Sequence, residues 1–216
     1  MVTQECSRST SKQVQDYLLC WDCEQRFSAR GENWMLANCY RKNGSFPLRE
    51  KLLSAIPEHA TEDLQVYAAA NLPGVCRNSL VYFGASVFWR AAVRTWAVPM
   101  TSTSIRIDLG RYEDDLRLFL LNEGDFPENI VMSVRISSLA SLLEVATLPQ
   151  SRTDSGCHVH DFTIPGVAFA LLVGARIPQE YRKFCTARSS EGFVFLSREL
   201  DSEFVQFMTR VGGMHR

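Results

Sequence analysis

The chain has 216 residues, of which 46% are hydrophobic and 22% are charged, and its formal net charge is −1. This composition is typical of a globular protein that can bury a core, and it excludes a chain that is disordered throughout. A net charge so close to zero also excludes an overall basic field that would attract nucleic acid, while leaving room for a local basic patch.

The start of the chain gives an expectation about the compartment. Residues Met1 to Arg8 are polar and contain no apolar core of a signal peptide. The longest strongly apolar run, Val167 to Val173, is far shorter than the roughly 18 residues that cross a bilayer. We therefore expect a cytoplasmic protein without membrane contact, in which the seven cysteines are reduced thiols or metal ligands.

The first sixty residues predict a short lead-in followed by a small module. Residues 1–13 are polar and rich in Ser and Thr, which predicts disorder. Residues 14–60 form the predicted module. It has a short strand from Val14 to Cys20 that leads into a Cys-x-x-Cys pair, a helix from Glu24 to Tyr40 and a helix from Leu48 to Ile56.

Residues 61–216 predict a larger domain with helices and several strands. The predicted elements are, in chain order, a segment at 63–70 that fits either a helix or an edge strand, a core helix at 76–97, a strand at 105–109, a helix at 112–122, a strand at 130–136, a polar loop at 149–156, strands at 157–164 and 166–173, a short helix at 179–184, a strand at 192–197 and a helix at 199–211. Because the strands cluster late in the chain, the predicted fold class is α+β with a mixed sheet.

Cys20 and Cys23 are the sharpest chemical feature of the sequence. Two thiolates two residues apart supply half of the ligands that a tetrahedral zinc ion needs. Cys6 and Cys39 are the candidates for further ligands. Cys39 lies 16 positions after Cys23, and a continuous helix would separate the two by about 24 Å. Cys39 therefore fits only if Gly31 breaks that helix sharply.

Two other interpretations of the pair stay open. A strand that leads into Cys-x-x-Cys at a helix start is also the setting of a thiol redox site, because the helix terminus lowers a thiol pKa. Asp22 and Glu24 argue against it, since neighbouring carboxylates raise the pKa of a thiol. In the third interpretation, Cys20 and Cys23 are small buried hydrophobic residues without a ligand.

Residues 17–28 read Tyr-Leu-Leu-Cys-Trp-Asp-Cys-Glu-Gln-Arg-Phe-Ser. They resemble a segment of uncharacterised bacterial proteins related to HNH-type treble-clef endonucleases. A weaker similarity continues through residues 82–92 and 108–112. The resemblance implies that Cys20 and Cys23 match the second zinc knuckle of that family.

The resemblance also sets an expectation about activity. Members of the family usually carry a first Cys-x-x-Cys and a Ser-His-Ile-Ile-Pro stretch ahead of this knuckle. Their His activates water, and a metal ion stabilises the leaving phosphate oxygen. No residue of this chain matches that His. The resemblance therefore implies a relative without the catalytic half, or one whose missing half comes from a partner or from an upstream start.

A second candidate metal site lies in the sequence Cys157-His158-Val159-His160-Asp161. Residues two apart on a strand share a face, so His158 and His160 are placed to chelate one metal ion. The sequence identifies no third ligand for them. The competing interpretation places the two histidines on the solvated face of an edge strand.

Basic residues mark a candidate contact surface for nucleic acid. Arg90 and Arg94 lie four residues apart in the predicted core helix, and Arg41 and Lys42 lie in a turn. With neighbouring aromatic residues, they are suited to bind phosphates and to stack on bases. The competing interpretation is a solvated face whose cations pair with nearby glutamates.

The leading hypothesis is a non-catalytic zinc-ribbon-like protein that binds a protein or nucleic-acid partner, as a degenerate relative of HNH-type proteins. Cys20 and Cys23 hold the zinc ion in this hypothesis. The first alternative is a metal-dependent nuclease that uses His158 and His160. The second is a thiol redox protein that uses the cysteine pair.

Overall fold

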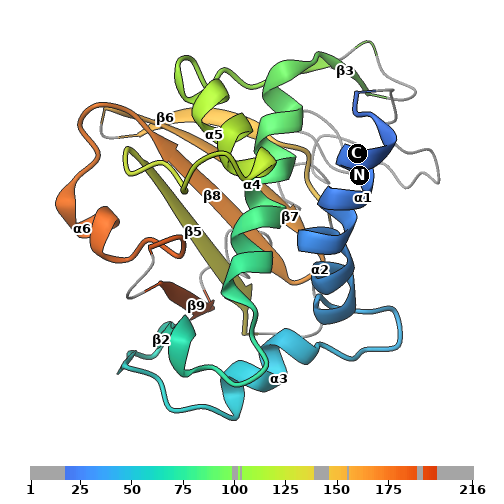
Figure 1. Cartoon of the computed structure of the whole chain (residues 1–216). Helices are drawn as coiled ribbons and strands as arrows, with labels where there is room; N and C mark the ends of the chain where they lie inside the picture. The colour runs from blue at the N-terminus through green and yellow to red at the C-terminus, as the bar shows by residue number, and fades with distance from the viewer. Residues whose placement is uncertain are drawn as a thin grey trace, which may run out of the picture.

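The fold combines helices with a mixed β-sheet in a computed structural model that describes residues 18–98, 102, 104–138, 146–154, 156–188 and 192–198. The predicted α+β class is confirmed (Figure 1). The helical segments are α1 (Trp21–Phe27), the π-helical turn η1 (Ser28–Glu32), α2 (Asn33–Asn38), α3 (Pro47–Leu53), the single turn η2 (Ala69–Asn71), α4 (Arg77–Val93), α5 (Tyr112–Leu121) and α6 (Gln179–Lys183). The strands are β1 (His59–Ala60), β2 (Leu64–Ala68), β3 (Trp96–Ala97), β4 (Ser104–Ile105), β5 (Ile130–Ser137), β6 (Gln150–Asp154), β7 (Cys157–Ile164), β8 (Val167–Val173) and β9 (Phe193–Ser197).

The described strands form one large sheet in the order β1-β2-β9-β5-β8-β7-β6, and β3 and β4 form a separate two-stranded ribbon. Neighbouring strands of the large sheet run antiparallel, except that β5 and β9 run parallel. β5 and β8 are buried along almost their whole length. This explains why their sequences are apolar rather than alternating, because a central strand packs on both of its faces.

Helix α4 crosses one face of the sheet and carries much of the core (Figure 1). Phe83 contacts Phe169 of β8 with ring centroids 5.5 Å apart, and Phe88 contacts Phe162 of β7 at 4.9 Å. Phe162 and Phe169 stack on each other at 4.8 Å. Such aromatic pairs add to the burial of apolar area, so α4 is fixed on the sheet by interlocking rings.

The chain from Trp21 to Asn38 forms one continuous helix that contains the turn η1. The sharp break at Gly31 that a Cys39 ligand would require does not occur. The glycine instead allows close packing, because a Cβ atom there would lie 2.9 Å from the backbone nitrogen of Phe83 in α4. The helix therefore crosses α4 backbone to backbone at this point, which only a residue without a side chain permits.

The opposite face of the sheet has a smaller apolar cluster. Val131, Val159 and Leu172 belong to it, and the segment around α6 packs against it. Phe184, at the end of α6, contacts Phe193 and Phe195 of β9. The sheet thus separates a large core under α4 from this second, smaller one.

Several predicted elements differ from the structure. The polar segment predicted as a loop at 149–156 contains β6, an exposed edge strand that pairs with β7. The strand predicted at 105–109 is limited to β4, and residues 106–109 are irregular. Residues 18–20 of the strand predicted at 14–20 are not extended strand, and 14–17 lie outside the described residues. The helix predicted at 199–211 also lies outside them.

The large apolar cluster includes side chains from both predicted units, such as Phe27 and Leu48 on one side of residue 60 and Leu80 and Val134 on the other. The lead-in at 1–13 lies outside the described residues.

Among the described helices, none combines the length and the apolar character that a membrane span requires.

Candidate functional site

The two cysteines of the Cys-x-x-Cys pair lie at the start of the helix that begins with α1. Cys20 is the N-cap residue, with an extended backbone, and its carbonyl accepts a hydrogen bond from the N–H of Glu24 at 3.0 Å. Cys23 lies in the first turn. Cys20 is exposed and Cys23 is partly exposed, so both sulfur atoms can be reached from solvent.

The two thiols differ in acidity because each lies beside the other. The neighbouring Cys23, through its backbone N–H and then its thiol, lowers the pKa of Cys20. The neighbouring Cys20, followed by partial burial, raises the pKa of Cys23. Cys20 is therefore the more acidic of the two thiols.

The expected effect of the neighbouring carboxylates on the pair is only partly observed. The charge of Asp22 raises the pKa of both cysteines. At Cys20 this effect is smaller than that of the neighbouring Cys23, since the pKa of its thiol ends below the ordinary value. Hydrogen bonds to a charged form stabilise it directly, whereas an exposed carboxylate is screened by water.

Neither of the predicted additional ligands joins the pair within the described residues. Cys39 is buried at the far end of the helix, where its thiol donates to the carbonyl of Leu36 at 3.8 Å. Burial raises the pKa of the Cys39 thiol. Cys6 lies outside the described residues. No group of three His, Cys, Asp or Glu side chains converges in the described part of the chain.

The two predicted histidines lie on β7, an inner strand between β6 and β8. His158 is exposed, whereas His160 is only 1% exposed. Nδ1 of His160 hydrogen-bonds to the hydroxyl of Ser151 at 2.7 Å, and its Nε2 is buried without a partner among the described residues. Burial, and then the charge of His158, lowers the pKa of His160 to about 4.

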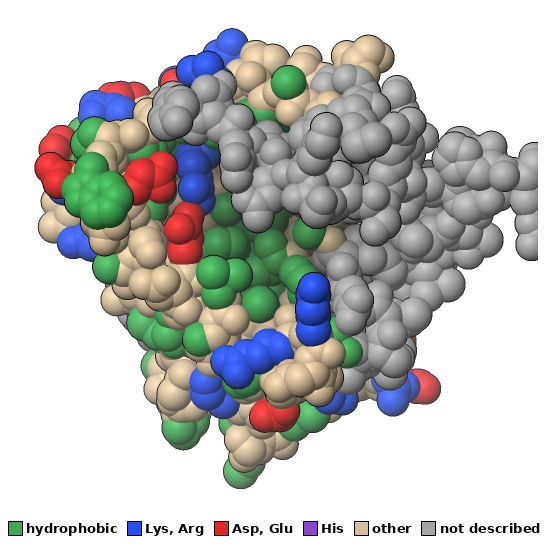
Figure 2. Space-filling view, turned by 90° about the vertical axis from the view of Figure 1, so that its right-hand side faces the viewer, with side chains coloured by type: hydrophobic (Ala, Val, Ile, Leu, Met, Phe, Trp, Pro, Cys, Tyr) green, Lys and Arg blue, Asp and Glu red, His purple; other side chains and the backbone are tan. Residues whose placement is uncertain are grey.

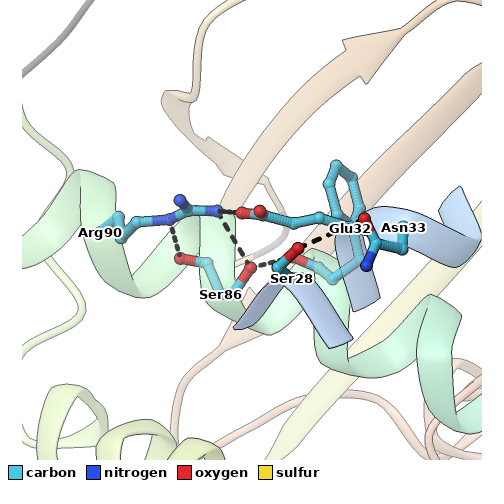
Figure 3. Close-up of polar contacts among 6 residues, drawn as sticks. Ser28, Glu32, Asn33, Ser86 and Arg90 are labelled. Atoms are coloured by element: carbon cyan, nitrogen blue, oxygen red, sulfur yellow. Dashed lines mark hydrogen bonds and ion pairs between the residues drawn. The ribbon is translucent and has the colours of Figure 1, made fainter. Parts of the chain in front are cut away.

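Two of the four predicted basic residues lie at the end of the helix α4. Arg90 of α4 forms a salt bridge with Glu32 of η1 at 2.7 Å, and its Nε donates to the carbonyl of Ser86 at 3.2 Å (Figure 3). Arg94 follows the end of α4 and has an extended backbone. Arg90 is therefore engaged in holding the first helix to α4.

The two remaining basic residues lie in the turn after α2. Arg41 donates to the carbonyl of Ala37, near the end of that helix, where a cation is favourable to the helix dipole. Lys42 is exposed. Figure 2 shows both Lys or Arg and Asp or Glu side chains around a central hydrophobic area on the described part of the face it presents.

A cavity of about 660 Å³ contains functional candidates that sequence reasoning missed. Arg30, Arg77 and Arg188 line it together with the aromatic residues Phe119 and Phe126. These side chains come from segments far apart in the chain. Proximity between such segments arises only from tertiary packing, so no local spacing or motif in the sequence could have indicated it.

The geometry thus assembles a solvent-exposed cysteine pair, a buried histidine and a cavity lined by arginines, while it engages Arg90 and Arg41 in contacts within the fold. Comparisons of the chain with protein-family models, with curated proteins and with solved structures found no match.

Proposed function

We propose that the protein holds a zinc ion through Cys20 and Cys23 and uses it to engage a binding partner. The observation that carries the proposal is the placement of the two cysteines in one turn at an exposed helix start, where Cys23 lowers the pKa of Cys20. Zinc binds thiolates, and a thiol with a lowered pKa loses its proton more readily when the metal binds.

The remaining zinc ligands come from outside the described residues in this proposal. A closed structural site needs four ligands, and the pair supplies two. Cys6, or a side chain of the partner, would complete the tetrahedron. Zinc binding would then join a second segment to the start of the helix that crosses α4, and the sheet domain would present the rest of the contact surface.

Metal analysis of the full chain, purified without chelators, tests this function. We expect bound zinc, and we expect the Cys20→Ser, Cys23→Ser double variant to lose it. Cys76→Ser is the matched control, because Cys76 is also exposed but lies at the start of α4. Cobalt(II) added to the metal-free chain should give thiolate-to-cobalt absorption that only the double variant loses. Zinc below about a tenth of an equivalent, with no cobalt absorption, would contradict the proposal.

The lowered pKa of Cys20 favours a second candidate function, thiol–disulfide exchange through the same pair. In this reaction the Cys20 thiolate attacks a disulfide of a substrate, and Cys23 then displaces the substrate thiol to form a Cys20–Cys23 disulfide. Alkylation of the Cys76→Ser variant across pH, followed by peptide mapping, tests it. We expect Cys20 to react first, with a midpoint at lower pH than that of Cys23. Equal reaction of Cys20 and Cys23 with midpoints near the ordinary thiol pKa of about 8.5 would exclude the exchange function.

A further inference from the structure

The cavity of about 660 Å³ lies between the helices that cover the sheet and the loops at the start of β5 and before β9. One wall is α4, which contributes side chains from Arg77 to Tyr82. The end of α5 and the following loop form a second wall. The volume lies within the roughly 300–1,000 Å³ of small-molecule sites.

One end of the cavity is rich in positive charge. Arg77 is the first residue of α4, and its guanidinium donates to the backbone carbonyl of Arg188, so the two residues are in contact. Arg188 itself is exposed, and among the described residues no carboxylate forms a salt bridge with it. Both arginines line the cavity, and the guanidinium group matches the geometry of a phosphate group.

The other end of the cavity is aromatic. The rings of Phe119 and Phe126 meet edge to face at 5.4 Å, and Tyr82 contacts Phe119 at 6.0 Å. Arg30 lies over the Tyr82 ring at 5.7 Å and donates to Oδ1 of Asn122 at 3.1 Å. Partly buried rings beside amide groups are suited to stack on a flat heterocycle and to hydrogen-bond with its edge.

The two ends lie along one helix. Tyr82 follows Arg77 by five positions in α4, which corresponds to a distance of about 7.5 Å along the helix axis. A ligand that fills both ends needs an anionic group and an aromatic ring that are joined by a short spacer. Asp125 and Glu128 also line the cavity, and they are suited to accept hydrogen bonds from hydroxyl groups of such a spacer.

We propose that this cavity binds a nucleoside phosphate. The phosphate lies against Arg77 and Arg188, and the base lies against Phe119 and Phe126, where Asn122 contacts its edge. Neither cysteine of the pair lines the cavity, so this site is additional to the proposed zinc site.

Calorimetric titration of the full chain with ADP, GDP, CDP and UDP tests the proposal. We expect at least one of them to bind with a dissociation constant below about 1 mM, and we expect the matching nucleoside and inorganic phosphate each to bind at least roughly tenfold more weakly. Arg188→Glu and Phe126→Leu should each weaken the nucleotide by roughly tenfold or more, since each removes one of the two recognition elements.

Arg117→Glu is the matched control, because Arg117 lies on α5 outside the cavity and pairs with Asp114. It should change the dissociation constant by less than about twofold. Circular dichroism of each variant verifies its fold. The proposal is overturned if none of the four nucleotides binds, or if Arg188→Glu and Phe126→Leu, both folded, bind as tightly as the parent chain. Binding of single-stranded oligonucleotides but of no free nucleotide would also overturn it.

Discussion

Arg90 of α4 and Glu32 of η1 form a salt bridge of 2.7 Å in which the two side chains are only 24% and 25% exposed. Arg90 also lies over the ring of Phe27 at 5.5 Å and donates from Nη2 to the hydroxyl of Ser86 at 3.3 Å (Figure 3). One guanidinium therefore joins α1, η1 and α4. The sequence made Arg90 a candidate for phosphate binding. In the structure it holds the first helix to α4.

Breaking this salt bridge should destabilise the protein. We expect Glu32→Gln or Arg90→Gln to lower the free energy of unfolding by about 1–3 kcal/mol, because each leaves a partly buried charge or donor without its partner. Urea unfolding of the single and double variants measures the coupling. The exposed pair Arg117 and Asp114 is the control and should contribute less than about 0.5 kcal/mol. Equal effects at the two pairs would contradict the expectation.

The close approach of the first helix to α4 at Gly31 gives a second prediction. An added Cβ atom would meet the backbone nitrogen of Phe83 at 2.9 Å, so one helix must shift. We expect Gly31→Ala to lower the free energy of unfolding by about 1–3 kcal/mol, despite the better helix propensity of alanine. Gly124→Ala is the control, since its nearest contact is the Leu118 Cβ atom at 3.8 Å. A Gly31→Ala variant as stable as the parent chain would show that the helices do not pack in this way.

The lowered pKa of His160, about 4, makes stability depend on pH. An unfolded His binds a proton below its ordinary pKa of about 6.5, whereas folded His160 stays neutral until about pH 4. The contribution of His160 to the free energy of unfolding is therefore complete above pH 6.5. It falls by up to roughly 3 kcal/mol as the pH drops toward 4. Urea unfolding across this range measures the slope. His160→Gln should flatten it, and His59→Gln, an exposed change on β1, should not.

Two buried serines should respond in opposite directions to replacement by alanine. The hydroxyl of Ser197 has no hydrogen-bond partner among the described residues, whereas that of Ser86 donates to the Phe83 carbonyl at 2.8 Å. We expect Ser197→Ala to leave the free energy of unfolding unchanged or to raise it by up to about 1 kcal/mol. Ser86→Ala should lower it by about 1 kcal/mol. Thermal unfolding of the two variants is the measurement, and a loss at Ser197 as large as that at Ser86 would refute the contrast.

The elements that were predictable from sequence are those with an apolar pattern of their own. The helix predicted at 76–97 is α4 (Arg77–Val93), which ends earlier than predicted because Trp96–Ala97 form the strand β3, and the strand predicted at 157–164 is β7 with the same bounds. β6 was missed, because Gln150–Asp154 is polar and exposed at the sheet edge, where no apolar face is required. Its strand state depends on pairing with β7, which is a tertiary contact.

The candidate site likewise has some features that are local in the chain and others that depend on tertiary packing. The helix start beside Cys20 and Cys23 follows from residues close together in the chain. The lowering of the Cys20 pKa by Cys23 depends on the local conformation of the first turn, and it outweighs the effect of the Asp22 charge. The pairing of Arg90 with Glu32 spans 58 positions, a separation at which no sequence pattern operates.

The π-helical turn Ser28–Glu32 sets the direction in which the cysteine pair faces. A π turn contains one residue more than an α-helical turn, so each residue after it is rotated by about 100° relative to a regular helix. Deleting one residue of this turn would keep a continuous helix and keep α2 in place. It would turn Cys20 and Cys23 about the helix axis by that angle, away from the side on which Arg26 reaches the carbonyl of Leu121. A single inserted residue thus determines which partners the pair can meet.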